Sequence, residues 1–315
     1  MNTHQAKIAD GLLAGGHDVV FAEIEVTVAR IRRDSGRRRA PARALTATVI
    51  VVGKPERLVA AAAALEQLGE TEGVRAILIS EGDQAAPVAR VTETSIAVSG
   101  LAPRYLNNAV AALRLSSLPA LVWWRGGSVE ALDDLANLAD RLVLDTAEPD
   151  AVWARAETLF ERTAVTDLRW ACLTRWRAAV AHLFDLPRVR RRASSLRTLT
   201  IEAADPFAAR LFAGWLKSSL RWTPDVKIAI RVATGDGAVP LTAVALAGES
   251  LTISLRVRPG HTCLEATVDD AVESTARIVP LGDGTLASLI GEELGVRTRD
   301  FAFEQALVTA REIRP

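Results

Sequence analysis

Two tryptophans, an arginine and a glycine turn stand together in the segment of this 315-residue sequence that most suggests chemistry. Residues 118–128 read LPALVWWRGGS, in which Trp123, Trp124 and Arg125 end a predicted strand and Ser128 is a candidate helix N-cap. In open α/β sheets ligands bind beyond the carboxyl ends of strands, and an arginine beside free helix amides suits an anion. The turn from Arg125 to Ser128 therefore predicts a site for a small anion such as a sugar phosphate.

The residue groupings that usually mark catalysis are absent from the sequence. No G-x-G-x-x-G follows the first predicted strand, no Gly-Lys-Ser/Thr stretch is present, and Pro55 removes a backbone donor from the turn at Lys54. The four histidines are widely scattered, and Cys172 and Cys263 form no C-x-x-C pair. Both cysteines are interpreted as inert core thiols. We therefore predict no catalytic residue, no metal and no cofactor, and a chain that is not an enzyme.

The overall composition is typical of a folded globular protein. Hydrophobic residues make up 49% of the chain and charged residues 24%, which excludes collagen-like, disordered and disulfide-scaffold proteins. The 38 basic and 38 acidic residues cancel, which argues against a surface devoted to nucleic acid. Because the sequence shows no secretory signal and no long apolar run, we expect a cytoplasmic protein that does not enter the membrane.

Two arginine-rich stretches allow more than one interpretation. Residues 30–43 contain seven arginines and one aspartate, and residues 188–192 contain four arginines. The first stretch is interpreted as a solvated linker, with a contact for an acidic partner or RNA as the alternative. Neither stretch is interleaved with the aromatic residues on which nucleic-acid bases stack, so nucleic-acid binding ranks last among the functions considered.

Predicted strands and helices alternate through the N-terminal part of the chain. Apolar, β-branched runs predict strands at 45–52, 74–79, 88–98, 120–124 and 141–144. Helical patterns lie at 21–34, 56–68, 105–115, 132–138 and 152–162, and the helix at 56–68 is expected to end at Gly69. This alternation predicts an α/β domain with a largely parallel sheet over residues 1–190.

The pattern changes after residues 166–184, which carry the longest helical periodicity. Pro187 and the arginines that follow it place a domain boundary between residues 186 and 196. Beyond the boundary we predict a short strand at 199–203, a helix at 205–220 capped by Asp205, strands at 226–232, 241–246, 251–257, 263–268 and 274–280, and helices at 286–294 and 301–313. These elements predict a smaller α+β domain with an antiparallel meander over residues 191–315.

Several motifs together carry a resemblance to a known family. They are the Trp123–Trp124 strand end, LANLADRLVLDT around Asp145, DLRWACLTRWR at 167–177, and FAGWLKSSL, RPG and LASLIGEEL farther along. From about Arg43 onward the chain thereby resembles the OpcA family, the glucose-6-phosphate dehydrogenase assembly proteins of cyanobacteria and actinobacteria. Relatives commonly have proline where this chain has Arg175. Residues 167–184 therefore form either one helix or two, the second capped by Thr174.

The resemblance implies a non-catalytic protein that binds glucose-6-phosphate dehydrogenase, helps its oligomer to assemble and acts as an allosteric activator in the oxidative pentose phosphate pathway. Tryptophan and arginine often anchor protein interfaces. The predicted partner-binding residues are Trp123, Trp124, Arg125, Trp170, Thr174, Trp176 and Arg177. Packing in the core is the alternative for each tryptophan. Because each half of the chain has one cysteine, the thiol switching associated with the cyanobacterial pathway is not expected here.

Overall fold

The computed structural model describes residues 11–37, 44–84, 87–233, 239–260, 262–270, 272–296 and 298–314. The chain divides into two compact units, the first made of Met1–Asp167 and Thr285–Arg299 and the second of Leu168–Gly284 and Asp300–Pro315. Each unit is built on its own β-sheet. The boundary expected near residue 190 lies within the second unit.

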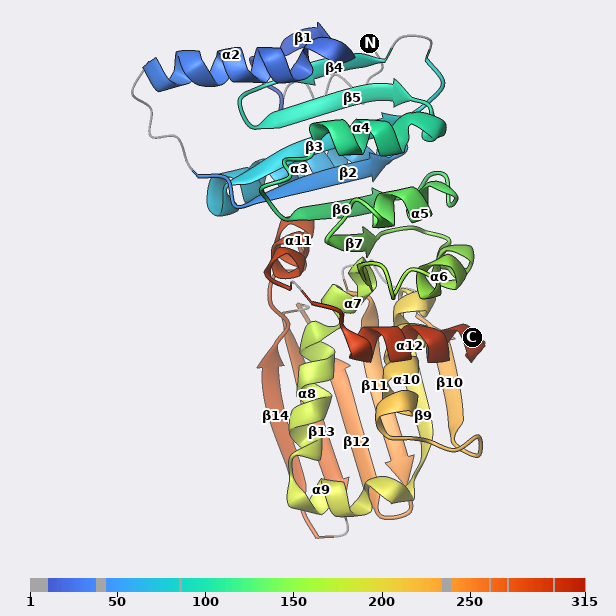
Figure 1. The fold of residues 1–315 in the computed structure, drawn as a ribbon. Coiled ribbons are helices and arrows are strands. Elements are labelled where there is room, and N and C mark those ends of the chain that lie inside the picture. Colours follow the sequence, from blue (N-terminus) through green and yellow to red (C-terminus); the bar gives the residue numbers. More distant parts are fainter. Residues whose placement is uncertain are drawn as a thin grey trace. The chain divides into compact units, whose positions relative to one another are not determined.

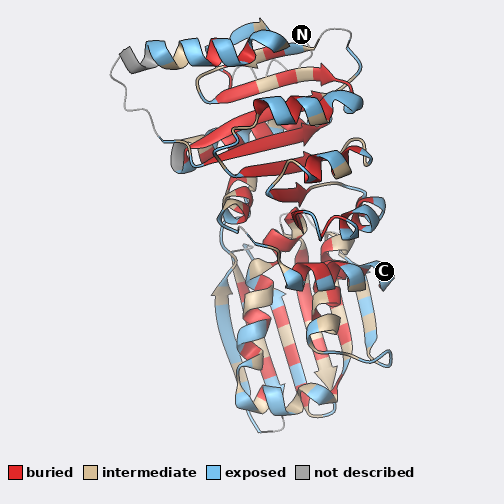
Figure 2. Cartoon of the chain, viewed as in Figure 1, coloured by how far each residue is buried: buried red, intermediate tan, exposed pale blue. Residues whose placement is uncertain are grey.

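The first unit contains an eight-stranded, mostly parallel sheet of order β1-β4-β5-β3-β2-β6-β7-β8 (Figure 1). Its parallel strands are β2 (Ala47–Gly53), β3 (Val74–Glu81), β5 (Ser95–Leu101), β6 (Ala120–Arg125), β7 (Arg141–Leu144) and β8 (Ala164–Asp167). An antiparallel edge is added by β4 (Val88–Val91) and β1 (His17–Val20). The central strands are buried along almost their whole length (Figure 2), which is why their sequences read as continuous apolar runs.

Helices cover both faces of this sheet. They are α2 (Ile24–Arg37), α3 (Pro55–Glu72), α4 (Leu106–Leu113), α5 (Ala131–Ala136), α6 (Pro149–Glu157) and α11 (Leu286–Gly295), with short 3-10 helices η1 (Phe21–Glu23) and η2 (Pro103–Tyr105). Figure 1 shows α4 and α5 in front of the strands and α3 behind them, as right-handed crossovers require. α11, although late in the sequence, packs on α3, where Gly291 approaches Leu68.

Several elements of the first unit differ from their predictions. β1 was not predicted, and α6 ends at Glu157 rather than at residue 162. α3 continues past Gly69 to Glu72 and ends at Gly73, whose φ of 65° suits a left-handed cap. The strand predicted at 88–98 is two strands, β4 and β5, joined by a turn in which Thr92 Oγ1 accepts from the Ser95 amide at 3.0 Å. Residues 164–167, expected in part as the start of a helix, form the strand β8 instead.

The second unit contains a six-stranded sheet of order β10-β9-β11-β12-β13-β14. Its strands are β9 (Leu196–Ala203), β10 (Lys227–Val232), β11 (Leu241–Gly248), β12 (Leu251–Val257), β13 (Cys263–Asp270) and β14 (Ser274–Pro280). β11 to β14 form the predicted antiparallel meander, whereas β10 runs parallel to β9. Alternate residues such as Leu199, Ile253 and Leu264 are fully buried, so one face of the sheet forms the core.

The helices of the second unit are α7 (Leu168–Cys172), α8 (Thr174–Phe184), α9 (Pro187–Arg192), α10 (Pro206–Ser219) and α12 (Phe301–Glu312), with the 3-10 helix η3 (Ala193–Ser195). Asp205 caps α10 as predicted, because its Oδ1 accepts from the amides of Phe207 at 2.9 Å and Ala208 at 3.3 Å. The segment 168–184 is two helices. Leu173 rather than Thr174 occupies the N-cap of α8, so the expected Thr174 cap is absent.

The α/β class predicted from the sequence is confirmed. Within the described ranges, no helix has both the length and the apolar character needed to cross a membrane. In the arginine-rich stretch 30–43, which the sequence predicted to be a linker, Arg30, Arg32, Arg33 and Arg37 belong instead to the helix α2. Arg38, Arg39 and Arg43 lie outside the described residues.

Candidate functional site

The carboxyl ends of β2 and β6 are the natural place for a site in the first unit. The six parallel strands lie side by side in the order β5-β3-β2-β6-β7-β8. When they are numbered 1 to 6 along the chain, starting from β2, this order becomes 3-2-1-4-5-6, and its direction reverses between β2 and β6. Ligands of such sheets bind where the order reverses. We call the two turns that follow these strands, residues 53–55 and 125–128, the switch point. The predicted anion turn from Arg125 to Ser128 is thus one half of it.

One carboxylate, that of Asp145 after β7, gathers three donors at the switch point. Its Oδ1 accepts from Arg57 Nη2 of α3 at 2.8 Å, and its Oδ2 lies 2.8 Å from Arg125 Nε and accepts from Trp123 Nε1 at 3.2 Å. The Arg125 guanidinium also lies 4.6 Å from the centre of the Trp123 ring. Because Trp123 and Arg125 are two residues apart in a strand, they share one face.

A second carboxylate, Glu81 at the end of β3, is held by the predicted anion turn. Both oxygens of Glu81 lie 3.2 Å from the backbone nitrogen of Ser128, which donates to them. Gly127, with a φ of 142°, leaves room for this carboxylate, because a Cβ there would collide with it. Burial raises the pKa of Glu81, although the Ser128 amide and the nearby Lys54 ammonium oppose the shift. The turn therefore already binds a carboxylate of its own chain.

Ser128 does not cap α5. The N-cap of that helix is Glu130, and the Ser128 hydroxyl donates to Glu130 Oε2 at 2.7 Å. Trp124 points to the sheet face opposite Trp123, where its ring is 1% exposed and its Nε1 has no hydrogen-bond partner among the described residues.

Three of the other predicted partner-binding residues lie together in the second unit, where Trp170 reaches the start of α12. Trp170 Nε1 donates to Asp300 Oδ2 at 2.7 Å, and Asp300 also caps α12 by accepting from the Phe303 amide at 3.0 Å. Arg177 lies with its guanidinium carbon 3.6 Å from the centre of the Trp170 ring and donates to Thr174 Oγ1 at 3.2 Å. Trp170, Thr174 and Arg177 therefore form one cluster, which α7 and α8 position.

Trp176 belongs to the core of the second unit. Its ring is fully buried and packs edge-on against Phe212 of α10, with the ring centroids 6.3 Å apart. It lies on the side of α8 that faces the interior, where it contacts α10.

Five of the seven predicted partner-binding side chains are buried. Trp123, Trp124, Arg125, Trp170 and Trp176 are each no more than 7% exposed, while Thr174 and Arg177 are half-buried. Trp123 and Arg125 meet in the first unit, and Trp170, Thr174 and Arg177 meet in the second. Their role in binding a partner stays a prediction, and for the five buried side chains it would be a positioning role rather than direct contact.

Sequence reasoning missed three charged residues that complete these clusters. Arg57, Glu81 and Asp300 read individually as ordinary helix, strand-end and turn residues. The position of Glu81 in the sequence could have indicated it. Glu81 ends a buried strand, and in a parallel sheet the carboxyl end of that strand lies beside that of β2. Asp300 could have been recognised as the N-cap of the helix predicted at 301–313.

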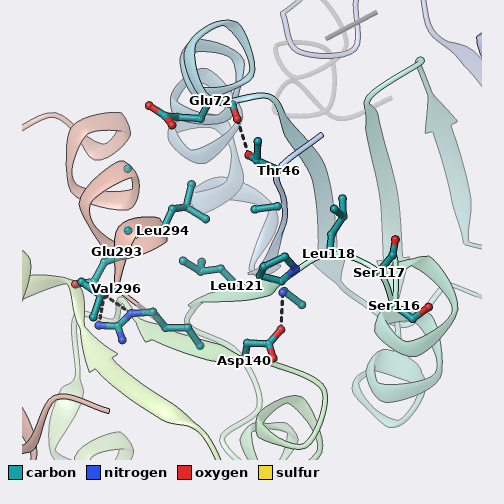
Figure 3. Close-up of a pocket in the computed structure, with 16 residues that line it drawn as sticks. Thr46, Glu72, Ser116, Ser117, Leu118, Leu121, Asp140, Glu293, Leu294 and Val296 are labelled. Atoms are coloured by element: carbon teal, nitrogen blue, oxygen red, sulfur yellow. Dashed lines mark hydrogen bonds and ion pairs between the residues drawn. The ribbon is translucent and has the colours of Figure 1, made fainter. Parts of the chain in front are cut away.

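A pocket of about 600 Å³ lies at the opposite, amino ends of β2, β6 and β7, beside α11 (Figure 3). A buried ion pair lines it, in which Arg141 Nε donates to Glu293 Oε2 at 2.5 Å. Asp140 also lines it, and its Oδ2 accepts from the Ala120 amide at 2.8 Å. These three charged side chains are engaged within the chain, whereas Ser116, Ser117 and Glu72 also line the pocket. No cluster of three or more histidine, cysteine or acidic residues suited to a metal ion occurs in the part of the chain that the structure describes.

Comparison with known proteins bears directly on the second unit. A family described as the C-terminal domain of a glucose-6-phosphate dehydrogenase subunit matches residues 163–307. The OxPP cycle protein OpcA of Nostoc punctiforme is 28% identical over 173 residues, which cover 50% of this chain and 36% of that protein. The protein of the same name from Synechococcus elongatus is 32% identical over 124 residues, which cover 36% of this chain and 28% of that protein. Residues 163–307, a little under half of the chain, therefore form an OpcA-family domain.

The matches to OpcA cover only part of those relatives, about a third of their length. Among solved structures, the chain is similar to KijD10, a 3-ketoreductase from Actinomadura kijaniata crystallised with NADP and TDP-benzene. The TM-score is 0.51 at 10% identity, over 84% of this chain and 95% of that one. At this identity the similarity establishes a shared fold and leaves the chemistry of the site to be judged from the residues present.

Proposed function

We propose that this chain is a non-catalytic partner of glucose-6-phosphate dehydrogenase, which helps the enzyme to assemble and raises its activity as an allosteric activator. The observation that carries the proposal is the match of residues 163–307 to a family described as a domain of a subunit of that dehydrogenase. The names of the OpcA relatives add the oxidative pentose phosphate pathway. The proposal places the chain in the cytoplasm with the enzyme.

The chemistry of the described residues supports a binding role. The groups that the sequence predicted to bind a small anion, Arg125 and the amide of Ser128, are engaged by Asp145 and Glu81 of the same chain. Cys172 and Cys263 are half-buried thiols in different elements. A group that is already paired must lose its partner before it can act on a substrate, so this arrangement favours a scaffold over a catalyst.

Activation by such a partner is a matter of differential binding. The chain activates the dehydrogenase only if it binds the active conformation more tightly than the inactive one. A tenfold preference corresponds to about 1.4 kcal/mol of differential contact energy, which a few interface side chains supply.

The test uses the purified chain and the glucose-6-phosphate dehydrogenase of the same organism. We expect the two proteins to co-elute in size-exclusion chromatography and the chain to lower the glucose-6-phosphate concentration that gives half-maximal rate. Bovine serum albumin at equal concentration controls for non-specific stabilisation of the enzyme. Separate elution together with an unchanged rate curve would contradict the proposal.

The predicted contact residues can be tested within the same assay. Thr174 is half-buried on α8, so its replacement does not open the core. If the cluster of Trp170, Thr174 and Arg177 lies in the interface, Thr174→Glu should raise the dissociation constant of the complex at least tenfold and reduce co-elution. The matched control is Thr252→Glu, an exposed position of β12 with the same change in side chain. A loss of binding with Thr252→Glu alone would instead assign the interface to the sheet of the second unit.

A further inference from the structure

We infer that the switch point of the first unit takes no dinucleotide, because side chains of the chain itself fill the positions that a dinucleotide would use. The strand order 3-2-1-4-5-6 is that of dinucleotide-binding sheets, and the fold is shared with a reductase crystallised with NADP. The fold thus implies a cofactor that must be tested against the residues present. The inference concerns the chain alone and holds whether or not it binds a dehydrogenase.

The turn after β2 lacks the features that bring a pyrophosphate close to the backbone. In a dinucleotide site this turn carries three glycines and opens a helix whose free amides face the phosphates. Here it reads Gly53-Lys54-Pro55, and α3 begins at Pro55, which has no N–H to donate. Gly53 serves a different contact, since a Cβ there would lie 3.1 Å from Cβ and from the backbone oxygen of Arg125. The glycine therefore accommodates the neighbouring strand rather than a phosphate.

Both arginines at the switch point are paired within the chain. Arg125 pairs with Asp145, and its Nη1 donates to the backbone oxygen of Arg57 at 2.9 Å, while Arg57 pairs with the other oxygen of Asp145. The side chains of Arg125 and Asp145 are only 8% and 15% exposed. A phosphate would have to displace a carboxylate that already satisfies both guanidinium groups, at the cost of burying that carboxylate unpaired.

The acidic residue of the second parallel strand is also engaged. In dinucleotide sites a carboxylate after this strand accepts hydrogen bonds from the ribose hydroxyls. Glu81 ends β3, but its carboxylate extends past the end of β2, the strand between β3 and β6, to the Ser128 amide. It thereby places a negative charge across the two turns where the phosphates of a dinucleotide would lie. Coulomb repulsion between that carboxylate and a phosphate adds to the steric conflict.

The test is a calorimetric titration of the full chain, free of any dehydrogenase, with NADPH and with NADP⁺. We expect no saturable binding at ligand concentrations up to about 1 mM. A dissociation constant of about 1 mM corresponds to only about 4 kcal/mol of binding free energy. A dinucleotide-dependent reductase titrated in the same buffer shows that the ligand and the instrument respond.

Two charge-reversal variants locate any binding that is seen. Lys54→Glu adds a negative charge to the exposed turn of the switch point, and Lys227→Glu makes the same change on the exposed strand β10 of the second unit. Binding with a dissociation constant below about 1 mM that Lys54→Glu weakens tenfold or more, while Lys227→Glu leaves it unchanged, would overturn the inference. No binding, or binding that Lys54→Glu does not alter, agrees with it. Neither outcome depends on whether the chain co-elutes with the dehydrogenase, so the two proposals fail separately.

Discussion

At the scale of single residues, this chain uses its charged groups to satisfy one another. Asp145 joins two arginines and a tryptophan, and Glu81 accepts from the turn that looked most like an anion site. Buried charges persist in proteins when they are paired and hydrogen-bonded. Paired groups near a strand end therefore resemble a ligand site in the sequence, although in the structure they stabilise the turns that carry them.

The raised pKa of Glu81 predicts a specific pH dependence of stability. Because burial raises this pKa above its ordinary value, the folded chain binds a proton more readily than the unfolded chain in the weakly acidic range. The free energy of unfolding then falls as pH rises from the unfolded pKa of about 4.3 through the folded one. Glu81→Gln keeps an oxygen acceptor for the Ser128 amide and removes this contribution. We expect the stability of the variant, relative to the natural chain, to increase as pH rises.

Urea denaturation of both proteins at several pH values between about 4 and 7 measures this difference. The natural chain is its own reference at the acidic end, where Glu81 is protonated and the two proteins should be closest in stability. Curves of unfolding free energy against pH that stay parallel, or that converge toward neutral pH, would show that the Glu81 carboxylate does not titrate as its burial predicts.

At the scale of elements, the short helix α7 joins the starts of two longer helices. Arg169 Nε donates to Asp205 Oδ2 at 2.7 Å, and Trp170 Nε1 donates to Asp300 Oδ2 at 2.7 Å. Asp205 and Asp300 are the N-caps of α10 and α12. Consecutive residues of one helix thus bind both caps.

Replacing Asp300 should therefore cost more than loss of a cap. Asp300→Ala removes the acceptor of the Phe303 amide, worth about 1 kcal/mol, and leaves the buried Trp170 N–H without its partner, at a cost of about 1 kcal/mol or more. We expect the free energy of unfolding to fall by about 2 kcal/mol in chemical denaturation.

A double-mutant cycle with Trp170→Phe isolates the tryptophan contribution, because phenylalanine keeps an aromatic ring against Phe303 and has no N–H. In the Trp170→Phe background, Asp300→Ala should cost only the cap. Equal costs in both backgrounds would mean that the hydrogen bond between Trp170 and Asp300 adds nothing to stability.

The sequence predicted elements well where one local rule decides the structure. Continuous β-branched runs placed β2 and β3, the Asp205–Pro206 pair placed the start of α10, and glycine and proline turns separated β11 to β14. Prediction failed where packing decides. Gly69 stays helical because its neighbour Leu68 is buried and holds this part of α3 in the core. The first residues of the helix expected at 166–184 belong instead to β8, because they pair in parallel with β7.

The candidate site was predicted in part. The sequence located the strand end at Trp123 and Arg125, and alternation correctly placed Trp123 and Trp124 on opposite faces. It could not show that Arg57, 68 residues before Arg125, would meet it, or that Glu81 would reach Ser128. Such pairings depend on the order of strands in the sheet, which short-range patterns do not determine.

At the scale of the whole molecule, the chain passes between its two units three times. It leaves the first unit after Asp167, returns for Thr285–Arg299, and enters the second unit again at Asp300. The returning segment contributes α11, whose Glu293 pairs with Arg141 at the start of β7, with side chains 5% and 6% exposed. Residues far toward the C-terminus are therefore part of the core of the first unit.

This exchange predicts that a substitution at residue 293 destabilises the unit formed mostly by residues 1–167. Glu293→Gln leaves the Arg141 guanidinium buried without a counter-charge, which should lower the free energy of unfolding of the first unit by about 3 kcal/mol. Glu292→Gln is the matched control, because the neighbouring glutamate of α11 is exposed and its loss should cost less than about 0.5 kcal/mol. Hydrogen exchange should show the effect as faster exchange in β6 and β7, with the sheet of the second unit unchanged. If instead Glu293→Gln speeds exchange in β9 to β14 and spares β7, the returning segment does not stabilise the first unit through this pair.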